Sequence, residues 1–244
     1  AVFTPVRGST RGLAIGSGLA TGLADDPYVM AGAAIDECVR NIVCVGGDPE
    51  TIAILDNFCW PSANDEKSLG RLVRCAHGCY DAAKAYGTPF ISGKDSLNNQ
   101  FTIESGETIY IPPTLLISGF GMVEDIHDCI TMDAKQSNTK MYLIGNTTDE
   151  LGGSHLLKVQ PNASCNTDLP TFCFDRGAAN AKLVHQAIKN GWVKSAHDCC
   201  EGGLLVAVAE MAFGGNLGAS IYPEASSTPE LCFAETPSRY ILEV

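Results

Sequence analysis

Two oxygen-bearing side chains lie one helical turn apart in the first fifth of the chain. Glu37 and Asn41 have i, i+4 spacing within an apolar pattern typical of a helix, which would place both side chains on one face. A carboxylate and an amide oxygen are hard ligands suited to Mg²⁺. The same spacing also fits a solvated helix face, and the neighbouring Asp36 and Arg40 have the spacing of an ordinary salt bridge.

Two further acidic residues follow apolar runs that are typical of strands. Asp56 comes after residues 51–55, and Asp198 comes after residues 192–196. Ligands commonly bind at the carboxyl ends of strands in α/β sheets, so Asp56 could contact a ligand and Asp198 could hold a bridging metal. The alternative for Asp56 is an Asx-turn, and the alternative for Asp198 is a plain turn before the next helix.

Glycines mark two segments with the properties of phosphate-binding loops. Residues 92–96 (SGKDS) combine a close backbone approach, a positive charge and hydroxyl donors. The spacing of a P-loop is absent, and an ordinary polar turn is the alternative. Gly202 and Gly203 precede an expected helix, whose first backbone N–H groups could hold an anion or simply be capped.

The elements that must position these residues alternate along the chain. Helical periodicity predicts helices over residues 31–45, 69–86, 178–190 and 204–213. Apolar runs predict strands over residues 51–55, 101–103, 108–111, 115–117, 141–144, 192–196 and 240–244, and residues 160–172 are expected to form a loop. A change of character over residues 124–140 predicts a boundary between domains 1–130 and 131–244, the second of which we expect to be truncated. The fold class is therefore α/β plus α+β.

Composition argues against several kinds of partner. The 244 residues carry a formal net charge of −12, which disfavours nucleic acid, because binding to its phosphates needs clustered Lys and Arg. No apolar run is long enough to span a membrane, and no signal-peptide pattern is present, so a cytoplasmic protein is expected. The 11 cysteines lack the spacing of a zinc site, and Cys38, Cys75 and Cys79 fall in helical apolar patterns that predict a place in the core.

Segments spread over nearly the whole chain resemble the second half of the phosphoribosylformylglycinamidine synthases, a family within the aminoimidazole ribonucleotide synthetase superfamily. They occur in the order of that family. The matching segments are residues 32–41 (GAAIDECVRN), 55–58 (LDNF), 87–96 (GTPFISGKDS), 197–213 (HDCCEGGLLVAVAEMAF) and 235–240 (ETPSRY).

This resemblance implies both a fold and a reaction. An N-terminal α/β domain would pair its sheet with that of a related half to form a β-barrel, and a C-terminal α+β domain would follow. The reaction would be an ATP-dependent C–N ligation in purine biosynthesis, in which an amide oxygen of formylglycinamide ribonucleotide is phosphorylated and ammonia displaces the phosphate. The implied cofactors are ATP or ADP and Mg²⁺.

The implied partners are the first half of the synthetase, a glutaminase subunit or domain that supplies ammonia, and a small bridging subunit or domain. If isolated, the chain is expected to self-associate through its N-terminal domain. The family's catalytic histidines belong to the first half, and no segment of this chain matches their motif. We therefore assign no catalytic residue here and expect the isolated chain to be inactive.

Roles for single positions are implied by the match and not by spacing. The resemblance assigns metal contacts to Glu37, Asn41 and Asp198, ATP contacts to Asp56, Gly93 and Cys200, and a substrate contact to Ser96. Two positions depart from the family. Lys94 stands where a metal-binding Asn is frequent, and an ammonium cannot coordinate a cation. Cys200 stands where a nucleotide-contacting Ser is usual, and a thiol forms weaker hydrogen bonds than a hydroxyl.

Two other functions stay open at this point. In the family the second half can carry a nucleotide that is bound but not consumed, so the chain could be an auxiliary nucleotide-binding module without turnover of its own. The third reading is a phosphotransferase of the same superfamily, such as a selenophosphate or thiamine-phosphate kinase. The Asp-rich N-terminal motif of those kinases is absent from this sequence.

Overall fold

The N-terminal part of the protein is built on a five-stranded sheet. In this computed structural model, which describes residues 1–171, 173–222 and 232–244, the sheet has the order β1-β2-β7-β3-β4. Its strands are β1 (Val2–Phe3), β2 (Gly12–Leu19), β3 (Ala53–Cys59), β4 (Phe90–Ser96) and β7 (Thr114–Val123). The β3/β4 pair is parallel and the other neighbouring pairs are antiparallel.

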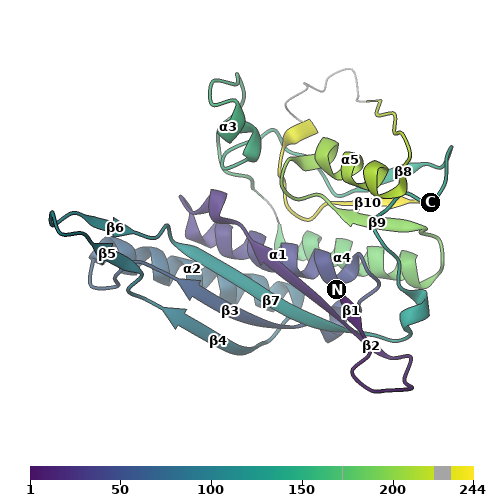
Figure 1. The fold of residues 1–244 in the computed structure, drawn as a ribbon, viewed down its shortest axis with the longest axis horizontal. Coiled ribbons are helices and arrows are strands. Elements are labelled where there is room, and N and C mark those ends of the chain that lie inside the picture. The colour runs from purple at the N-terminus through teal and green to yellow at the C-terminus, as the bar shows by residue number, and fades with distance from the viewer. Residues whose placement is uncertain (172, 223–231) are drawn as a thin grey trace.

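Two helices cover one face of this sheet (Figure 1). They are α1 (Pro27–Val43) and α2 (Glu66–Tyr86). Each begins where the sequence supplies a cap, because the Asp26 and Asp65 side chains accept hydrogen bonds from backbone N–H groups of the first turn. Helix α1 lies very close to β2, since a Cβ at Gly18 would stand 1.9 Å from the carbonyl oxygen of Ala34. A larger residue at position 18 would therefore push α1 off the sheet.

The opposite face of the sheet is not covered by a helix among the described residues. Ile15 and Leu19 on β2 are 46% and 44% exposed on this side. A two-stranded hairpin, β5 (Gln100–Thr102) and β6 (Thr108–Tyr110), extends beyond the end of the sheet (Figure 1). In the described part of the chain, the sheet therefore has one face packed by helices and one uncovered face.

The C-terminal part carries a second, smaller sheet. It contains β8 (Met141–Ile144), β9 (Ser195–Asp198) and β10 (Tyr240–Glu243) in the antiparallel order β8-β10-β9. Its helices are α3 (His155–Val159), α4 (Phe174–Lys189) and α5 (Gly203–Gly215). Helix α4 packs against α1 and α2, so one hydrophobic core runs from the N-terminal helices to the small sheet.

The chain between the two parts is anchored rather than loose. Glu243, on β10, is fully buried and accepts hydrogen bonds from the backbone N–H groups of Lys135 and Gln136 and from the Thr139 hydroxyl. Short 3₁₀ turns include those at residues 21–23, 49–51 and 126–128. Within the described residues, no helix is long and apolar enough to cross a membrane.

The mixed α/β class is confirmed, and the predicted helices all exist with shifted ends. Cys38, Cys75 and Cys79 lie in the core as expected. Residues 160–171 form no helix or strand, and residue 172 of that predicted loop lies outside the described residues. Three details were wrong. Residues 92–96 form part of β4 instead of a polar turn, and Asp56 lies in the middle of β3 instead of after it. The strand expected over residues 192–196 is Ser195–Asp198, so Asp198 ends this strand instead of following it.

Candidate functional site

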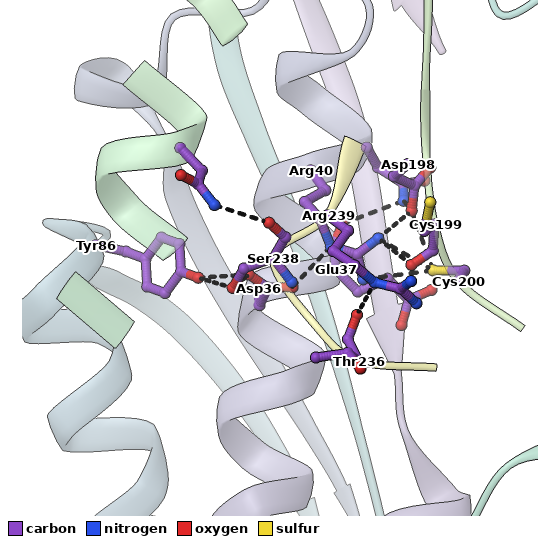
Figure 2. A network of polar contacts seen from close by, with 12 residues as sticks. Asp36, Glu37, Arg40, Tyr86, Asp198, Cys199, Cys200, Thr236, Ser238 and Arg239 are labelled. Atoms are coloured by element: carbon purple, nitrogen blue, oxygen red, sulfur yellow. Dashed lines mark hydrogen bonds and ion pairs between the residues drawn. The ribbon is translucent and has the colours of Figure 1, made fainter. Parts of the chain in front are cut away.

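Residues from both parts of the chain meet at one buried polar cluster (Figure 2). Helix α1 contributes Asp36, Glu37, Arg40 and Asn41, which lie within little more than one turn. The other side is formed by Asp198 at the end of β9 and the residues that follow it. The cluster therefore joins two segments that are about 160 positions apart in the sequence.

The Arg40 guanidinium is the centre of this cluster. Arg40 is 4% exposed. Its Nε donates to Asp36 Oδ2 at 2.7 Å, and its Nη1 donates to Asp198 Oδ2 at 2.7 Å and to the Cys199 carbonyl oxygen at 3.0 Å. Both terminal nitrogens also lie 3.5 Å from Cys200 Sγ. Arg40 thus bridges two buried carboxylates, one from each part of the chain.

Asp36 is fully buried, and its carboxylate accepts hydrogen bonds from three different residues. Besides Arg40, it accepts from the Ser238 backbone N–H at 2.8 Å, from the Ser238 hydroxyl at 2.6 Å and from the Tyr86 hydroxyl. Ser238 has a φ of 64°, in the left-handed region that a residue with a side chain rarely adopts. The two bonds from Ser238 to Asp36 hold this turn in place before β10.

The Asp198 carboxylate is ionised by its surroundings. Burial alone would raise its pKa, but the Arg40 charge and hydrogen bonds from His197 and Cys200 outweigh burial, so the pKa of Asp198 lies well below its usual range. The Cys200 thiol donates to Asp198 Oδ2 at 3.0 Å, and the Asn41 Nδ2 lies 3.4 Å from the same oxygen. Oδ2 therefore faces three donors.

In the part of the chain that the structure describes, Glu37 has no ion-pair partner, whereas Asp36 and Asp198 both pair with Arg40. Its Oε2 accepts the Leu19 backbone N–H at 2.8 Å. Burial, opposed by Arg40 and reinforced by Glu201 and Asp198, raises the pKa of Glu37 to about 7. Among the described residues, Glu37, Cys200 and Glu201 form a group whose possible ligand atoms all lie within 4.8 Å of one another, although burial raises the pKa of the Cys200 thiol and keeps it protonated.

A cavity of about 260 Å³ opens beside the cluster, between the two parts of the chain. Its walls include Glu37 and Arg40, the 3₁₀ turn at residues 21–23, and the loop that leads into α3. This loop lies against the turn so closely that a Cβ at Gly22 would stand 2.3 Å from the Gly153 carbonyl oxygen. Lys158 adds a positive charge to the wall of the same cavity.

The glycine pair at the start of α5 has the predicted helix-start geometry, but both of its backbone donors are engaged, since the Gly203 N–H donates to the Cys200 carbonyl oxygen at 3.0 Å. Gly202 and Gly203 have φ values of 78° and 66°, which explains why glycine occupies both positions. The Gly202 N–H donates to Glu235 Oε1 at 2.8 Å, and the same oxygen accepts the His155 backbone N–H at 2.8 Å. The anion at this helix start is therefore a carboxylate of the chain itself.

This geometry tests the Mg²⁺ site that the family resemblance implies for Glu37, Asn41 and Asp198. The structure does bring these three side chains together, but Asp198 Oδ2 is bonded to Arg40, and Asn41 presents its Nδ2, which also donates to the Glu37 carbonyl oxygen at 3.1 Å. A Mg²⁺ ion would need these groups as oxygen ligands at about 2.0–2.1 Å. In this arrangement the set does not fit Mg²⁺ at Asp198, and the metal assignment stays a prediction.

The remaining predicted positions form a separate group on β3 and β4. Asp56 and Gly93 are paired in register, and the Asp56 carboxylate lies over Gly93, where a Cβ would stand 2.2 Å from Oδ1. Both lie on the helix-covered side, together with the buried Ile54. Ser96 points to the opposite, uncovered side, where its hydroxyl accepts from Lys94 Nζ at 2.6 Å. No hydrogen bond or ion pair links this group to Asp198 within the described parts of the chain.

Sequence reasoning missed the central role of Arg40 and the part played by Glu235. Arg40 was assigned only to a local salt bridge with Asp36. A signal was present, because residues 31–35 and 42–45 on both sides of residues 36–41 are all apolar or small, and a charge inside such a helix needs a buried partner. No comparable pattern marks Glu235, because its hydrogen-bond donors, Gly202 and His155, are distant from it in the sequence.

Two family models match consecutive parts of the chain. The model described as AIR synthase related protein, N-terminal domain, matches residues 2–123, and the model described as AIR synthase related protein, C-terminal domain, matches residues 136–244. Together they cover both sheets and both sides of the buried cluster.

Solved structures share this fold. PurL of Thermotoga maritima complexed with FGAR has a TM-score of 0.74 and 16% identity over 96% of this chain and 38% of its own length. PurLQS from the same organism has a TM-score of 0.71 and 18% identity, over 96% and 36%. Thiamine monophosphate kinase from Aquifex aeolicus has a TM-score of 0.60 and 14% identity, over 100% and 81%. The chain thus spans less than two fifths of the PurL chains that it matches.

Proposed function

The chain belongs to the AIR synthase related family, and from this premise we propose that it is the second half of a phosphoribosylformylglycinamidine synthase. Such an enzyme is an ATP-dependent ligase. ATP phosphorylates an amide oxygen of formylglycinamide ribonucleotide, and ammonia then attacks the activated carbon, so that inorganic phosphate leaves and the amidine forms. Solved structures of T. maritima PurL with FGAR, ATP and ADP support a ribonucleotide and a nucleotide as the ligands.

One observation carries this proposal. The segments 32–41 and 197–203 are both parts of the resemblance to these synthases, and they meet around the cavity of about 260 Å³ between the two parts of the chain. Concave sites between domains are where small ligands usually bind. The cavity also offers Lys158 as a counter-charge for phosphate.

The group on β3 and β4 does not line the interdomain cavity, and we propose that it contacts ligands in the assembled enzyme. The proposal gives ATP contacts to Asp56 and the Gly93 backbone and a substrate contact to Ser96. Because Gly93 and Ser96 lie on opposite faces of β4, this division fits two different ligands better than one. The Cys200 thiol donates a hydrogen bond to Asp198 and would contact the nucleotide only weakly.

The partners follow from the same proposal. The uncovered face of the five-stranded sheet, with Ile15 and Leu19 exposed, suits pairing with the equivalent sheet of a first half or, for the isolated chain, of a second copy. A glutaminase would deliver ammonia to the assembled enzyme, and a small bridging subunit or domain would join the two. We propose a cytoplasmic setting for this assembly.

Reconstitution tests the proposal. The purified chain is given ATP, formylglycinamide ribonucleotide and an ammonium salt, and amidine formation is followed with and without a separately expressed first half. We expect no product from the chain alone and turnover once the first half is added. Amidine formation by the chain alone, or none in any combination with a folded first half, would overturn the proposal. A Glu50→Gln variant, altered only at an exposed ion pair, serves as the control.

A kinase function is the second candidate, because the alignment with Aquifex aeolicus thiamine monophosphate kinase covers 100% of this chain and 81% of that enzyme. Thiamine monophosphate offered with ATP distinguishes the two: conversion of ATP to ADP with this acceptor would favour the kinase. An auxiliary nucleotide-binding role is distinguished within the reconstituted enzyme. Nucleotide that stays bound to this half, unhydrolysed through many turnovers, would identify it as a structural ligand.

A further inference from the structure

The position that the family resemblance gives to a metal is already filled by a cation of the chain. The Arg40 Nη1 lies 2.7 Å from Asp198 Oδ2 and 3.0 Å from the Cys199 carbonyl oxygen. Two oxygens thus converge on one charged nitrogen, much as they would on a metal ion. We propose that Arg40 is the resident cation of this interdomain site, and that the chain binds Mg²⁺ at Asp198 only when the guanidinium is removed.

Arg40 is held too firmly to make way for an ion. Its Nε is bonded to Asp36 while Nη1 is bonded to Asp198, so the two ends of the guanidinium are fixed by different carboxylates. A swing away from Asp198 would also break the contact with the fully buried Asp36. Leaving one buried carboxylate without its partner is strongly unfavourable.

The groups beside Asp198 present hydrogen-bond donors to its carboxylate, and not oxygen ligands for an ion. Asn41 directs its Nδ2 toward Asp198 because the Glu37 carbonyl oxygen, 3.1 Å away, accepts from the same nitrogen. The Cys200 thiol also donates to Asp198. A divalent ion beside Asp198 would be repelled by the Arg40 charge at close range in a buried place, where screening is weak.

The backbone donors beside this site are also occupied by a group of the chain itself. Glu235 accepts the backbone N–H groups of Gly202 and His155, donors that would otherwise be available to an anion. The site therefore contains its own positive and negative partners. Removing Arg40 would leave Asp36 and Asp198 as two buried carboxylates around a space that requires a cation, with the Cys199 carbonyl oxygen as a further hard ligand.

The test uses MgCl₂ alone, without nucleotide, at constant ionic strength. Mg²⁺ binding is measured by calorimetry, and the midpoint of thermal unfolding is measured with and without Mg²⁺. The proteins are the wild type, Asp198→Asn, Arg40→Ala, and a matched control in which Arg40→Ala is combined with Asp198→Asn. Because no reaction is measured, failure of this inference is distinct from failure of the proposed ligase function.

We expect no Mg²⁺ binding and no shift of the midpoint for the wild type. Arg40→Ala should have a lower midpoint that Mg²⁺ raises, with affinity at least about a hundredfold above any wild-type binding, because a like charge has been removed from a buried site. The double variant should lose the response. Wild-type binding that Asp198→Asn abolishes would overturn the inference, and so would a folded Arg40→Ala that ignores Mg²⁺. If Arg40→Ala does not fold, the wild-type titration still decides, with Arg40→Gln as the second variant.

Discussion

The Asp36 carboxylate should be among the most important single groups for the stability of the chain. It is fully buried on α1 and accepts hydrogen bonds from Arg40, from the Tyr86 hydroxyl, and from both the backbone N–H and the hydroxyl of Ser238. Ser238 belongs to the C-terminal part, so Asp36 ties the two parts together directly. An Asp36→Ala substitution removes the carboxylate that accepts all of these bonds, although Arg40 keeps its bond to Asp198.

The expected loss follows from these contacts. Removing one partner of a buried ion pair costs about 3–5 kcal/mol, and each neutral hydrogen bond adds about 1 kcal/mol when it is lost. These terms overlap, because Arg40 keeps its bond to Asp198, and we expect a loss of about 5 kcal/mol. For a chain of this size the melting temperature should fall by about 10–20 °C.

Urea unfolding at neutral pH measures this loss, with circular dichroism and tryptophan fluorescence as probes. Lys182 and Glu50 provide a matched control, because they also join the two parts, at 3.0 Å, but with side chains 59% and 69% exposed. Glu50→Gln should cost less than about 1 kcal/mol. If Asp36→Ala were no more destabilising than Glu50→Gln, the buried cluster would not be what holds the two parts together, and the reasoning would be refuted.

Three further predictions concern single residues. Burial raises the pKa of Glu37 to about 7, so between pH 4.5 and 7 the folded chain holds a proton that the unfolded chain releases. The free energy of unfolding should therefore fall as the pH rises from about 4.5 to 7. Glu37→Gln should remove this fall in urea titrations at several pH values. Burial alone would raise the pKa of Asp198, but Arg40 holds it below its usual range, so its stabilisation is present at neutral pH and is lost as pH falls below about 4; Asp198→Asn should flatten the acid limb of the same titration, and an unchanged limb would contradict this. In the reconstituted enzyme, Ser96→Ala should raise the KM for formylglycinamide ribonucleotide by up to about tenfold and the KM for ATP less, whereas an equal rise in both would mean that β4 has moved.

Local patterns were enough to predict the helices. The 3.6-residue periodicity of α1 and α2 is visible in the sequence, and Gly87 ends α2 in the left-handed conformation expected of a C-terminal cap. The edge strand β4 was not predicted, because it lies at the end of the sheet order and most of its residues are exposed. An exposed edge strand has no apolar alternation, so residues 92–96 resembled a polar turn.

The sequence predicted some of the residues that meet at the buried cluster but not the bonds between them, and the roles that the resemblance assigns to these residues stay predictions. Glu37, Asn41, Asp198 and Cys200 do come together, as the resemblance implied. The bond between Arg40 and Asp198 could not be predicted, because it depends on how the small sheet packs against α1. From the sequence, Asp36 and Arg40 had the spacing of an ordinary salt bridge, whereas the packing of the C-terminal part turns them into a buried bridge between two parts of the chain.

We propose that this chain forms half of an enzyme that phosphorylates an amide oxygen and replaces that oxygen with the nitrogen of ammonia. Isotope transfer tests it most directly. Formylglycinamide ribonucleotide labelled with oxygen-18 at the reacting amide is converted by the chain together with a first half, ATP and ammonia, and the inorganic phosphate is analysed by mass spectrometry. The account predicts that each phosphate released carries the label from the amide. Turnover that leaves the phosphate unlabelled would contradict it.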